Sequence, residues 1–251
     1  MAGEIVILCA AGLGVGVIIG TAGVGGVLLV PILVTALGFP VRTAVADALW
    51  SYLWSGLVAI ALYWRRGSIP ARPALWLCLA SLPGAYLGAR TLGVVPPAVV
   101  QGLIAAVLLL GGIHSLRPQP AARRTRELGP GTLAPVGGLV GFASALLGAG
   151  GAFLLVPLLV TLGEPVLLAV GLGQAIQVPV AALASVTNFQ AGRIDLVAGS
   201  VLAAALSVGV AVGTPLAHSL SQQGLKRLVA VAMLVAGVVM AARVWGAATS
   251  A

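Results

Sequence analysis

The chain contains very little charge. Only 7% of its 251 residues are charged, whereas 60% are hydrophobic. A soluble domain needs roughly 25% charged residues to cover its surface, so the composition excludes one. Apolar runs of about 20 residues, the length that crosses a bilayer of about 30 Å, recur along nearly the whole chain. The sequence therefore predicts an all-α integral membrane protein with the lipid bilayer as its main solvent.

Groups for catalysis and metal binding are also scarce. The chain has two cysteines and two histidines, and neither His114 nor His218 has metal-ligand spacing with the other or with a cysteine. Cys9 and Cys78 lie in apolar runs, where a thiol is usually a packing residue, and a thiol that handles a sulfur substrate is the alternative. The HExxH, Walker and GxSxG motifs are absent. We expect no cofactor, no metal site, no enzyme activity and no ATP-driven step.

The sequence consists of two similar halves. The segment GVGG at 23–26, followed by VLLVP, returns 125 positions later as GAGG at 148–151, followed by AFLLVP. The same offset relates further pairs of glycines, namely Gly67 and Gly192, Gly84 and Gly209, Gly88 and Gly213, and Gly112 and Gly237. Two homologous apolar halves, each broken near its start by glycines, are typical of secondary transporters.

Each half divides into about four or five hydrophobic segments. We expect a first membrane repeat at 1–116, a cytoplasmic linker at 117–131 and a second membrane repeat at 132–251. The first two segments of each half are short and meet at the Gly-rich turn, so either both cross the membrane or they form a broken, re-entrant hairpin. In both cases each half crosses an odd number of times, and the second repeat is expected to be inverted.

The basic residues set the expected orientation. They lie in short loops between apolar runs, which favours a role in topology and argues against a nucleic-acid partner. Nine of the 13 Lys and Arg residues fall on one side of the predicted topology, and the positive-inside rule makes that side cytoplasmic. The other four are Arg42, Arg90, Arg193 and Arg243. We therefore expect a multi-pass protein of the cell (inner) membrane with both termini outside the cytoplasm.

The Gly-rich turns are the first candidate for a substrate site. Helices are expected to begin after Gly25-Gly26 and after Gly150-Gly151, and a helix start carries unpaired N–H groups and partial positive charge. Inverted symmetry would bring the two starts together near the midplane. The prediction is an anion held by backbone amides, with Thr21 and Ser144 close by. The candidate glycines are Gly23, Gly25, Gly26, Gly148, Gly150 and Gly151. The alternative is that these glycines only permit close helix packing.

The third segment of each half adds polar side chains. In the first half Asp47, Ser51 and Ser55 share one helical face, and an acid inside an apolar helix by default marks a functional site. Asp47 could couple transport to a proton or a sodium ion, or pair with Arg90 or Arg42. The alternative is a charge near the helix start. Because an ionised carboxylate repels an anion, we expect no direct contact with substrate unless Asp47 is protonated.

The matching face of the second half carries amides. Gln174 and Gln177 are the favoured site residues, with Thr187 and Asn188 further along, because amides and hydroxyls can bind an oxyanion without a full charge. Pro179 is expected to interrupt this helix and free backbone groups. The alternative is ordinary interhelical hydrogen bonding, worth about 1 kcal/mol for each bond.

These motifs carry a family resemblance. GVGGVLLVPILVTALGFPVRTAVA and GAGGAFLLVPLLVTLGEPVLLAVG, each followed by a long helix that ends near a glycine, resemble the two repeats of the sulfite exporter TauE/SafE family, also called TSUP. The resemblance implies a permease for sulfur-containing or related anions, such as sulfite, sulfoacetate or thiosulfate. Relatives commonly have a Thr-Ser pair in the third segment, where this chain has Asp47-Ala48 and Leu172-Gly173, so its site is expected to differ.

Three functions remain open at this point. The favoured one is a secondary transporter that works by alternating access between two inverted repeats, with a small anion as substrate and a proton or sodium as possible coupling ion. A passive channel for an anion or small solute is the second. A membrane-embedded assembly or processing protein is the third, although the sequence lacks a catalytic constellation. A monomer and a homodimer are equally compatible with the sequence.

Overall fold

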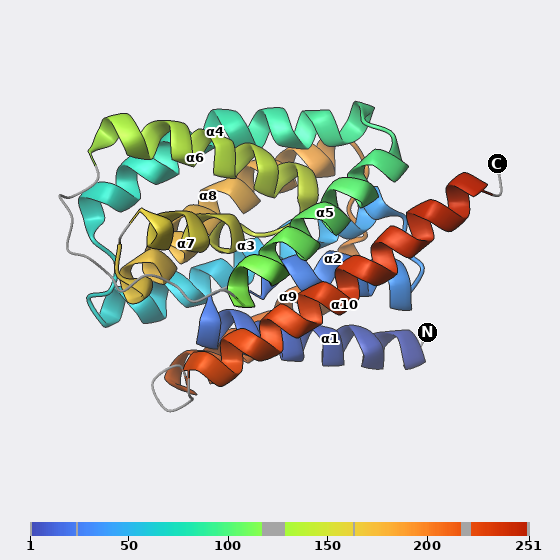
Figure 1. Cartoon of the computed structure of the whole chain (residues 1–251), viewed down its shortest axis with the longest axis horizontal. Helices are drawn as coiled ribbons and strands as arrows, with labels where there is room; N and C mark the ends of the chain where they lie inside the picture. Colours follow the sequence, from blue (N-terminus) through green and yellow to red (C-terminus); the bar gives the residue numbers. More distant parts are fainter. Residues whose placement is uncertain (1, 24, 117–128, 163, 217–221, 250–251) are drawn as a thin grey trace.

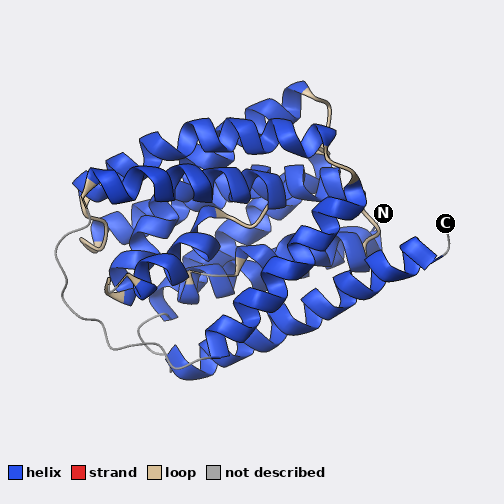
Figure 2. Ribbon diagram, turned by 45° about the horizontal axis from the view of Figure 1, so that its top comes forward, coloured by secondary structure: helices blue, strands red, loops and turns tan. Residues whose placement is uncertain are grey.

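Helices make up most of the described structure, a computed structural model that covers residues 2–23, 25–116, 129–162, 164–216 and 222–249. Within these residues short loops join the helices, and no strand occurs (Figure 2). The predicted all-α class is therefore confirmed. Most of the predicted linker, 117–128, lies outside the described residues.

The helix bounds repeat at the offset of the sequence repeat. The first half forms α1 (Ala2–Ala22), the short 3-10 helix η1 (Gly26–Leu28), α2 (Leu29–Ala36), α3 (Val41–Arg65), α4 (Ala71–Val94) and α5 (Pro97–Leu116). The second half forms α6 (Pro130–Leu147), α7 (Gly151–Thr161), α8 (Val166–Gln190), α9 (Leu196–Leu216) and α10 (Gln222–Thr249). The bounds of α3 and α8 differ by 125 positions at both ends, so equivalent sequences form equivalent helices.

Full-length and partial helices alternate at the start of each half. Seven of the described helices are long and apolar enough to cross a membrane, among them α1, α3, α6 and α8. In contrast, α2 has 8 residues and α7 has 11, which at about 1.5 Å per residue gives roughly 12 and 16 Å against a hydrocarbon core of about 30 Å. Neither short helix can cross alone, which favours the broken-helix interpretation of the Gly-rich hairpins.

The two halves are interleaved. Figure 1 shows α4 beside α6 along one edge of the molecule and α1 beside α9 along the opposite edge. An added Cβ at Gly84 of α4 would overlap the backbone carbonyl of Gly138 in α6, and at the equivalent Gly209 of α9 it would overlap that of Leu13 in α1. Glycine therefore permits both close approaches. The repeat pairs Gly84/Gly209 and Gly88/Gly213 serve helix packing.

The helices α3 and α8 lie at the centre and run antiparallel. Their apolar windows are 56% and 72% buried, the highest values among the seven long apolar helices. At one end Asp195, just beyond the end of α8, donates its N–H to Asp47 near the start of α3. At the other end an added Cβ at Gly171, near the start of α8, would meet the carbonyl of Ser68, just beyond α3, at 2.5 Å.

Candidate functional site

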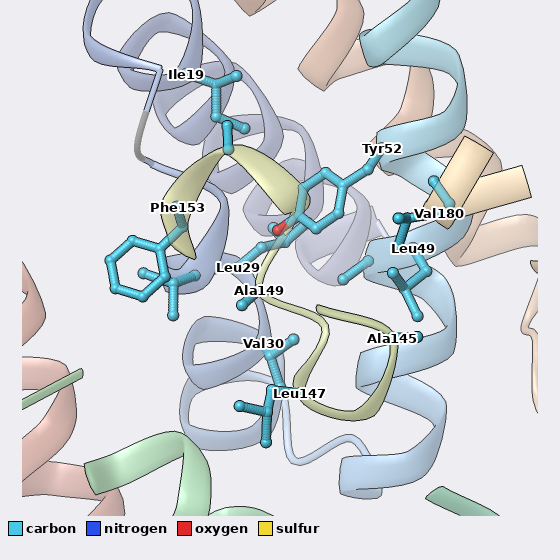
Figure 3. Close-up of a cluster of buried hydrophobic side chains, with 14 of the residues drawn as sticks. Ile19, Leu29, Val30, Leu49, Tyr52, Ala145, Leu147, Ala149, Phe153 and Val180 are labelled. Carbon is cyan, nitrogen blue, oxygen red and sulfur yellow. The ribbon is translucent and has the colours of Figure 1, made fainter. Parts of the chain in front are cut away.

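The two Gly-rich turns meet in the interior between α3 and α8. A Cβ added to Gly26 in the first turn would lie 3.2 Å from the backbone oxygen of Ala149 in the second. In return, a Cβ on Gly148 would lie 2.8 Å from the Val30 side chain of α2. Figure 3 shows Val30, Ala149 and Tyr52 gathered around this contact. The turns touch directly, so a substrate could enter between them only after they part.

The two turns have different backbone conformations. Gly23 and Gly148 both have positive φ, 71° and 62°, and each ends its long helix by donating its N–H to a carbonyl four residues back. Beyond them the halves differ, since Gly150 has φ 68° whereas Gly25 has φ −95°. The second half enters α7 directly at Gly151, and the first passes through η1 before α2.

Tyr52 and Gln177 flank the meeting turns and occupy equivalent positions, 125 residues apart, on α3 and α8. The Tyr52 hydroxyl donates a hydrogen bond to the backbone carbonyl of Gly26, and Figure 3 shows the ring directed toward the turns. Gln177 Nε2 donates to the Tyr52 carbonyl at 3.4 Å, and its Oε1 is 3.4 Å from the Cβ position of Gly150. Each central helix thus supplies one polar side chain to a turn.

Sequence reasoning included Gln177 among the candidates but missed Tyr52. Tyr52 is completely buried and lies among apolar residues in the sequence. The signal that could have found it is the repeat itself, because a candidate at Gln177 implies examining the residue 125 positions earlier.

Two further candidates near the turns are buried without hydrogen-bond partners. Ser144, one turn before the end of α6, has a fully buried Oγ with no partner, and Gln174, one turn before Gln177, has neither amide atom bonded. An unpaired buried amide or hydroxyl typically costs about 1–3 kcal/mol. These groups can therefore donate to an oxyanion without first giving up a protein partner.

Other predicted residues have partners elsewhere. Thr21 Oγ1 donates to the Val17 carbonyl of its own helix at 2.8 Å. Asn188 Oδ1 accepts from Arg193 at 3.0 Å, and Asn188 lies 11 residues beyond Gln177, about 16 Å along the helix. The structure therefore places Thr21 near the turns with its hydroxyl occupied, and does not bring Asn188 to them. Thr187 donates to its own helix at Leu183.

Asp47 and Ser51 lie toward α9 and away from the turns. Asp47 is fully buried, and its Oδ1 accepts the backbone N–H of Asp195 at 2.9 Å. Ser51 Oγ lies 2.7 Å from the Asp47 carbonyl and 3.2 Å from the Gly199 carbonyl of α9. Asp195 in turn accepts the N–H groups of Val197 and Ala198, which caps the start of α9. We call the contact of Asp47 and Ser51 with Asp195 and Gly199 the latch.

The arginines considered as partners for Asp47 make their contacts elsewhere. Arg42 donates to the Val95 carbonyl at 3.0 Å, and the Arg90 guanidinium lies over the Tyr86 ring, 5.2 Å from its centroid. A third arginine, Arg193, donates to the Ala89 carbonyl at 3.2 Å. Burial lowers the pKa of the Arg193 guanidinium from its ordinary value, and the positive charge of Arg42 lowers it further. The two arginines Arg42 and Arg193 are therefore neighbours at one end of the molecule.

Pro179 does not interrupt its helix, contrary to the sequence-based expectation. Helix α8 runs unbroken from Val166 to Gln190. Proline removes the bond to the carbonyl four residues back, which here belongs to Ala175. The Cys78 thiol of α4 donates to that oxygen at 3.4 Å. A neighbouring helix thus satisfies the freed carbonyl, and Cys78 gains a structural role.

Metal chemistry has no support among the residues that the structure describes, where no group of three or more His, Cys, Asp or Glu side chains could hold an ion. The fold and the site together define a multi-pass helical membrane protein with buried polar groups at its centre. A sequence profile described as Sulfite exporter TauE/SafE matches residues 8–240. The chain belongs to this family, which makes it a membrane transporter for sulfite or related anions. No curated protein and no solved structure matches the chain.

Proposed function

We propose that the chain is a secondary transporter for small sulfur-containing anions such as sulfite, thiosulfate or sulfoacetate. The observation that carries the proposal is the contact of two Gly-rich turns between antiparallel α3 and α8, with Tyr52 and Gln177 at equivalent positions beside them. Broken helices at the interface of two repeats are the usual substrate site of such transporters.

The substrate would bind where the turns part. Amides at the start of α7 and of η1 would face the anion, and the partial positive charge of a helix start favours a negative ligand. Tyr52, Gln177, Gln174 and Ser144 would supply neutral hydrogen-bond donors. A site without a fixed positive charge suits an anion that must be released again.

The transport cycle would alternate access between two inverted repeats. Each half has four long helices plus one partial helix. Because the equivalent helices α3 and α8 run antiparallel, equivalent segments would face opposite sides of the membrane. We assign the cell (inner) membrane, with both termini outside the cytoplasm. Asp47 remains the candidate for coupling to a proton or to sodium.

Counterflow into proteoliposomes tests this function. Vesicles loaded with unlabelled sulfite, thiosulfate or sulfoacetate are diluted into the labelled anion, with chloride and acetate as non-sulfur controls. We expect saturable uptake that is accelerated by internal substrate for at least one sulfur anion. Saturable flux without acceleration would indicate a channel, and no flux for any sulfur anion would contradict the substrate class.

Two variants test the site in the same assay. Tyr52→Phe removes the hydroxyl beside Gly26 and keeps the ring, and Gln177→Leu removes the amide beside Gly150. We expect both to raise KM. Gln190→Leu is the matched control, because Gln190 is an exposed glutamine at the end of the same helix. If Gln177→Leu and Gln190→Leu raised KM equally, the substrate site would not lie at the turns.

A further inference from the structure

A cavity opens at one end of the molecule between α4, α6 and α8. Its volume is about 460 Å³. Arg72 and Trp76 from the first turns of α4 line it, and Leu168 and Leu172 from the start of α8 lie opposite. Here the beginning of α4 stands away from α8, although one turn deeper the two helices are joined by the bond from Cys78 to Ala175.

The residues at the positions equivalent to the cavity lining, related by the 125-residue offset of the repeat, form the latch. Leu172 of α8 corresponds to Asp47 of α3, and Pro70 before α4 corresponds to Asp195 before α9. At the cavity Pro70 and Leu172 line an open space, although Ser68, two residues before Pro70, packs directly on Gly171 of α8. At the latch Asp195 and Gly199 hydrogen-bond directly to Asp47 and Ser51. Equivalent parts of the two halves therefore differ in packing, with a cavity in one half and a hydrogen-bonded contact in the other.

The latch and the cavity lie at opposite ends of α3. Asp47 is near the helix start, and Pro70 follows a few residues after its end at Arg65. The 18 residues from Asp47 to Arg65 correspond to about 27 Å of helix. Tyr52 and Gln177 lie between, each five residues beyond the equivalent positions Asp47 and Leu172. The candidate substrate site thus lies between a cavity at one end and the latch at the other.

The cavity end lacks the polar pair that forms the latch, although Arg72 and Glu164 also line it. At the latch, the Asp47 carboxylate accepts an N–H from Asp195. At the cavity the corresponding residues are leucine and proline, so the acceptor side chain is missing and the proline has no N–H to donate. The two halves therefore share a fold but differ in the chemistry that can close each end.

The Asp47 carboxylate is poorly satisfied in the closed latch. Its Oδ2 atom is buried and lacks a hydrogen-bond partner. The charged residue that contacts Asp47 is Asp195, through its backbone N–H, and the adjoining segments also contain Arg42 and Arg193. Asp195 caps α9, and both arginines donate to backbone carbonyls. Helices α2 and α6, which also pack on α3, contain no charged residue, and α5 carries only His114 at its far end.

A proton suits this site better than a sodium ion. A bound cation needs several oxygen ligands, but Oδ1 already faces the Asp195 N–H, whose partial positive charge repels a cation. A proton on Oδ2 leaves that hydrogen bond in place and removes the cost of an ionised carboxylate buried with a single partner.

We propose that the protonation state of Asp47 controls which end of the transporter is open. With Asp47 protonated, the latch holds the first turn of α9 against α3, and the cavity end is open. Loss of the proton releases α9 and admits water to the latch. The role of this switch in transport rests on the proposed function, but the switch itself needs no substrate, so the two can fail separately.

Thiol labelling at two equivalent positions tests the switch. In a Cys9→Ala, Cys78→Ser background, Ala198→Cys reports the latch, since Ala198 is buried in the first turn of α9. Pro73→Cys reports the cavity, which it lines. A water-soluble maleimide is applied to the purified protein from pH 5 to pH 9, and the rate at 198 is divided by that at 73 to cancel the intrinsic pH dependence of thiols.

We expect this ratio to rise at least tenfold from low to high pH. In Asp47→Asn, which keeps the oxygen that accepts the Asp195 N–H but cannot ionise, the ratio should stay low at every pH. Asp195→Asn is the matched control, because asparagine also caps a helix, and the rise should persist in it. A flat ratio in the parent, or an equal rise in Asp47→Asn, would overturn the proposal.

Substrate transport distinguishes the two hypotheses. If the labelling switch is observed and no sulfur anion is transported, the proposed substrate class fails and the proton switch stands. If counterflow is observed and the ratio does not depend on Asp47, the transport function stands and the switch fails. Size-exclusion profiles that match the parent show that each variant is folded before it is labelled.

Discussion

The latch end and the cavity end are equivalent in sequence position but differ in chemistry and in packing. At the latch, a buried aspartate and a serine of α3 hold the first turn of α9. At the cavity, Leu172 of α8 and Pro70 before α4 leave about 460 Å³ between the helices. The comparison shows that two repeats with the same fold can have different contacts at their equivalent ends. A few side-chain differences at equivalent positions can give the two ends different contacts.

The largest effect is expected from substitutions that disturb the close helix packing of α4 on α6 and of α9 on α1. Gly84→Ala and Gly209→Ala each place a methyl group against a backbone carbonyl of the neighbouring helix. Overpacking of this kind costs about 1–3 kcal/mol, and we expect similar losses because the two contacts are equivalent. Thermal unfolding in detergent measures them. Gly102→Ala in α5 is the control, since its Cβ would meet nothing within 4 Å. A loss at only one site would break the equivalence.

A second prediction distinguishes the effect of backbone strain on stability from an effect on the substrate site. Gly150 and Gly192 have φ of 68° and 64°, so alanine at either position is strained, by about 1–3 kcal/mol. Only Gly150 lies at the meeting turns, beside Gln177. We expect both variants to be less stable, and only Gly150→Ala to lower counterflow, by about tenfold or 1.4 kcal/mol. Equal counterflow in the two variants would place the site elsewhere.

A third prediction concerns the two side chains that flank the turns. Tyr52→Phe removes one hydrogen bond, typically worth about 0.5–1.5 kcal/mol, so KM for the transported anion should rise a few-fold, at most about tenfold. Because the Tyr52 hydroxyl bonds to Gly26 in the turn, whereas Asp47 and Ser51 contact Asp195 and α9, the pH dependence of labelling at 198 should not change. Counterflow kinetics measure the change in KM, and the labelling ratio measures the pH dependence. A changed pH profile with an unchanged KM would contradict the prediction.

The smallest expected effect is at Cys78. Cys78→Ala removes the donor that satisfies the Ala175 carbonyl freed by Pro179. A thiol is a weak donor, so we expect a loss of stability below about 1 kcal/mol and unchanged counterflow. Cys78→Ser restores a donor and should recover the stability. A large loss of transport in Cys78→Ala would revive a direct role of the thiol in handling a sulfur substrate.

Much of the fold could be predicted from the sequence, because hydrophobic length and the 125-residue repeat are strong signals. The third segments were expected at 43–64 and 168–188 and form α3 (Val41–Arg65) and α8 (Val166–Gln190). The continuity of α8 through Pro179 was not predicted, since the compensating thiol comes from a helix distant in sequence.

The candidate site could be predicted only in part. A helical-face argument gives the direction in which a side chain points but not which helix lies opposite it. Ser51 was therefore expected to bind substrate, yet its neighbour is Gly199 of α9. Asn188 lies on the right helix but too far along it. The glycines and Gln177 were found from motif and amide chemistry, whereas Tyr52 needed the tertiary contact with Gly26.

The central claim is that equivalent ends of the two halves exchange open and closed states. Spin-label pairs at equivalent positions test it most directly in the cysteine-free background, one pair at Arg72 and Leu168 across the cavity, the other at Val197 and Thr43 across the latch. Distances are measured by electron spin resonance at low and at high pH. We expect the cavity pair to approach and the latch pair to separate as the pH rises. Distances that change in the same direction at both ends, or at neither, would contradict the account.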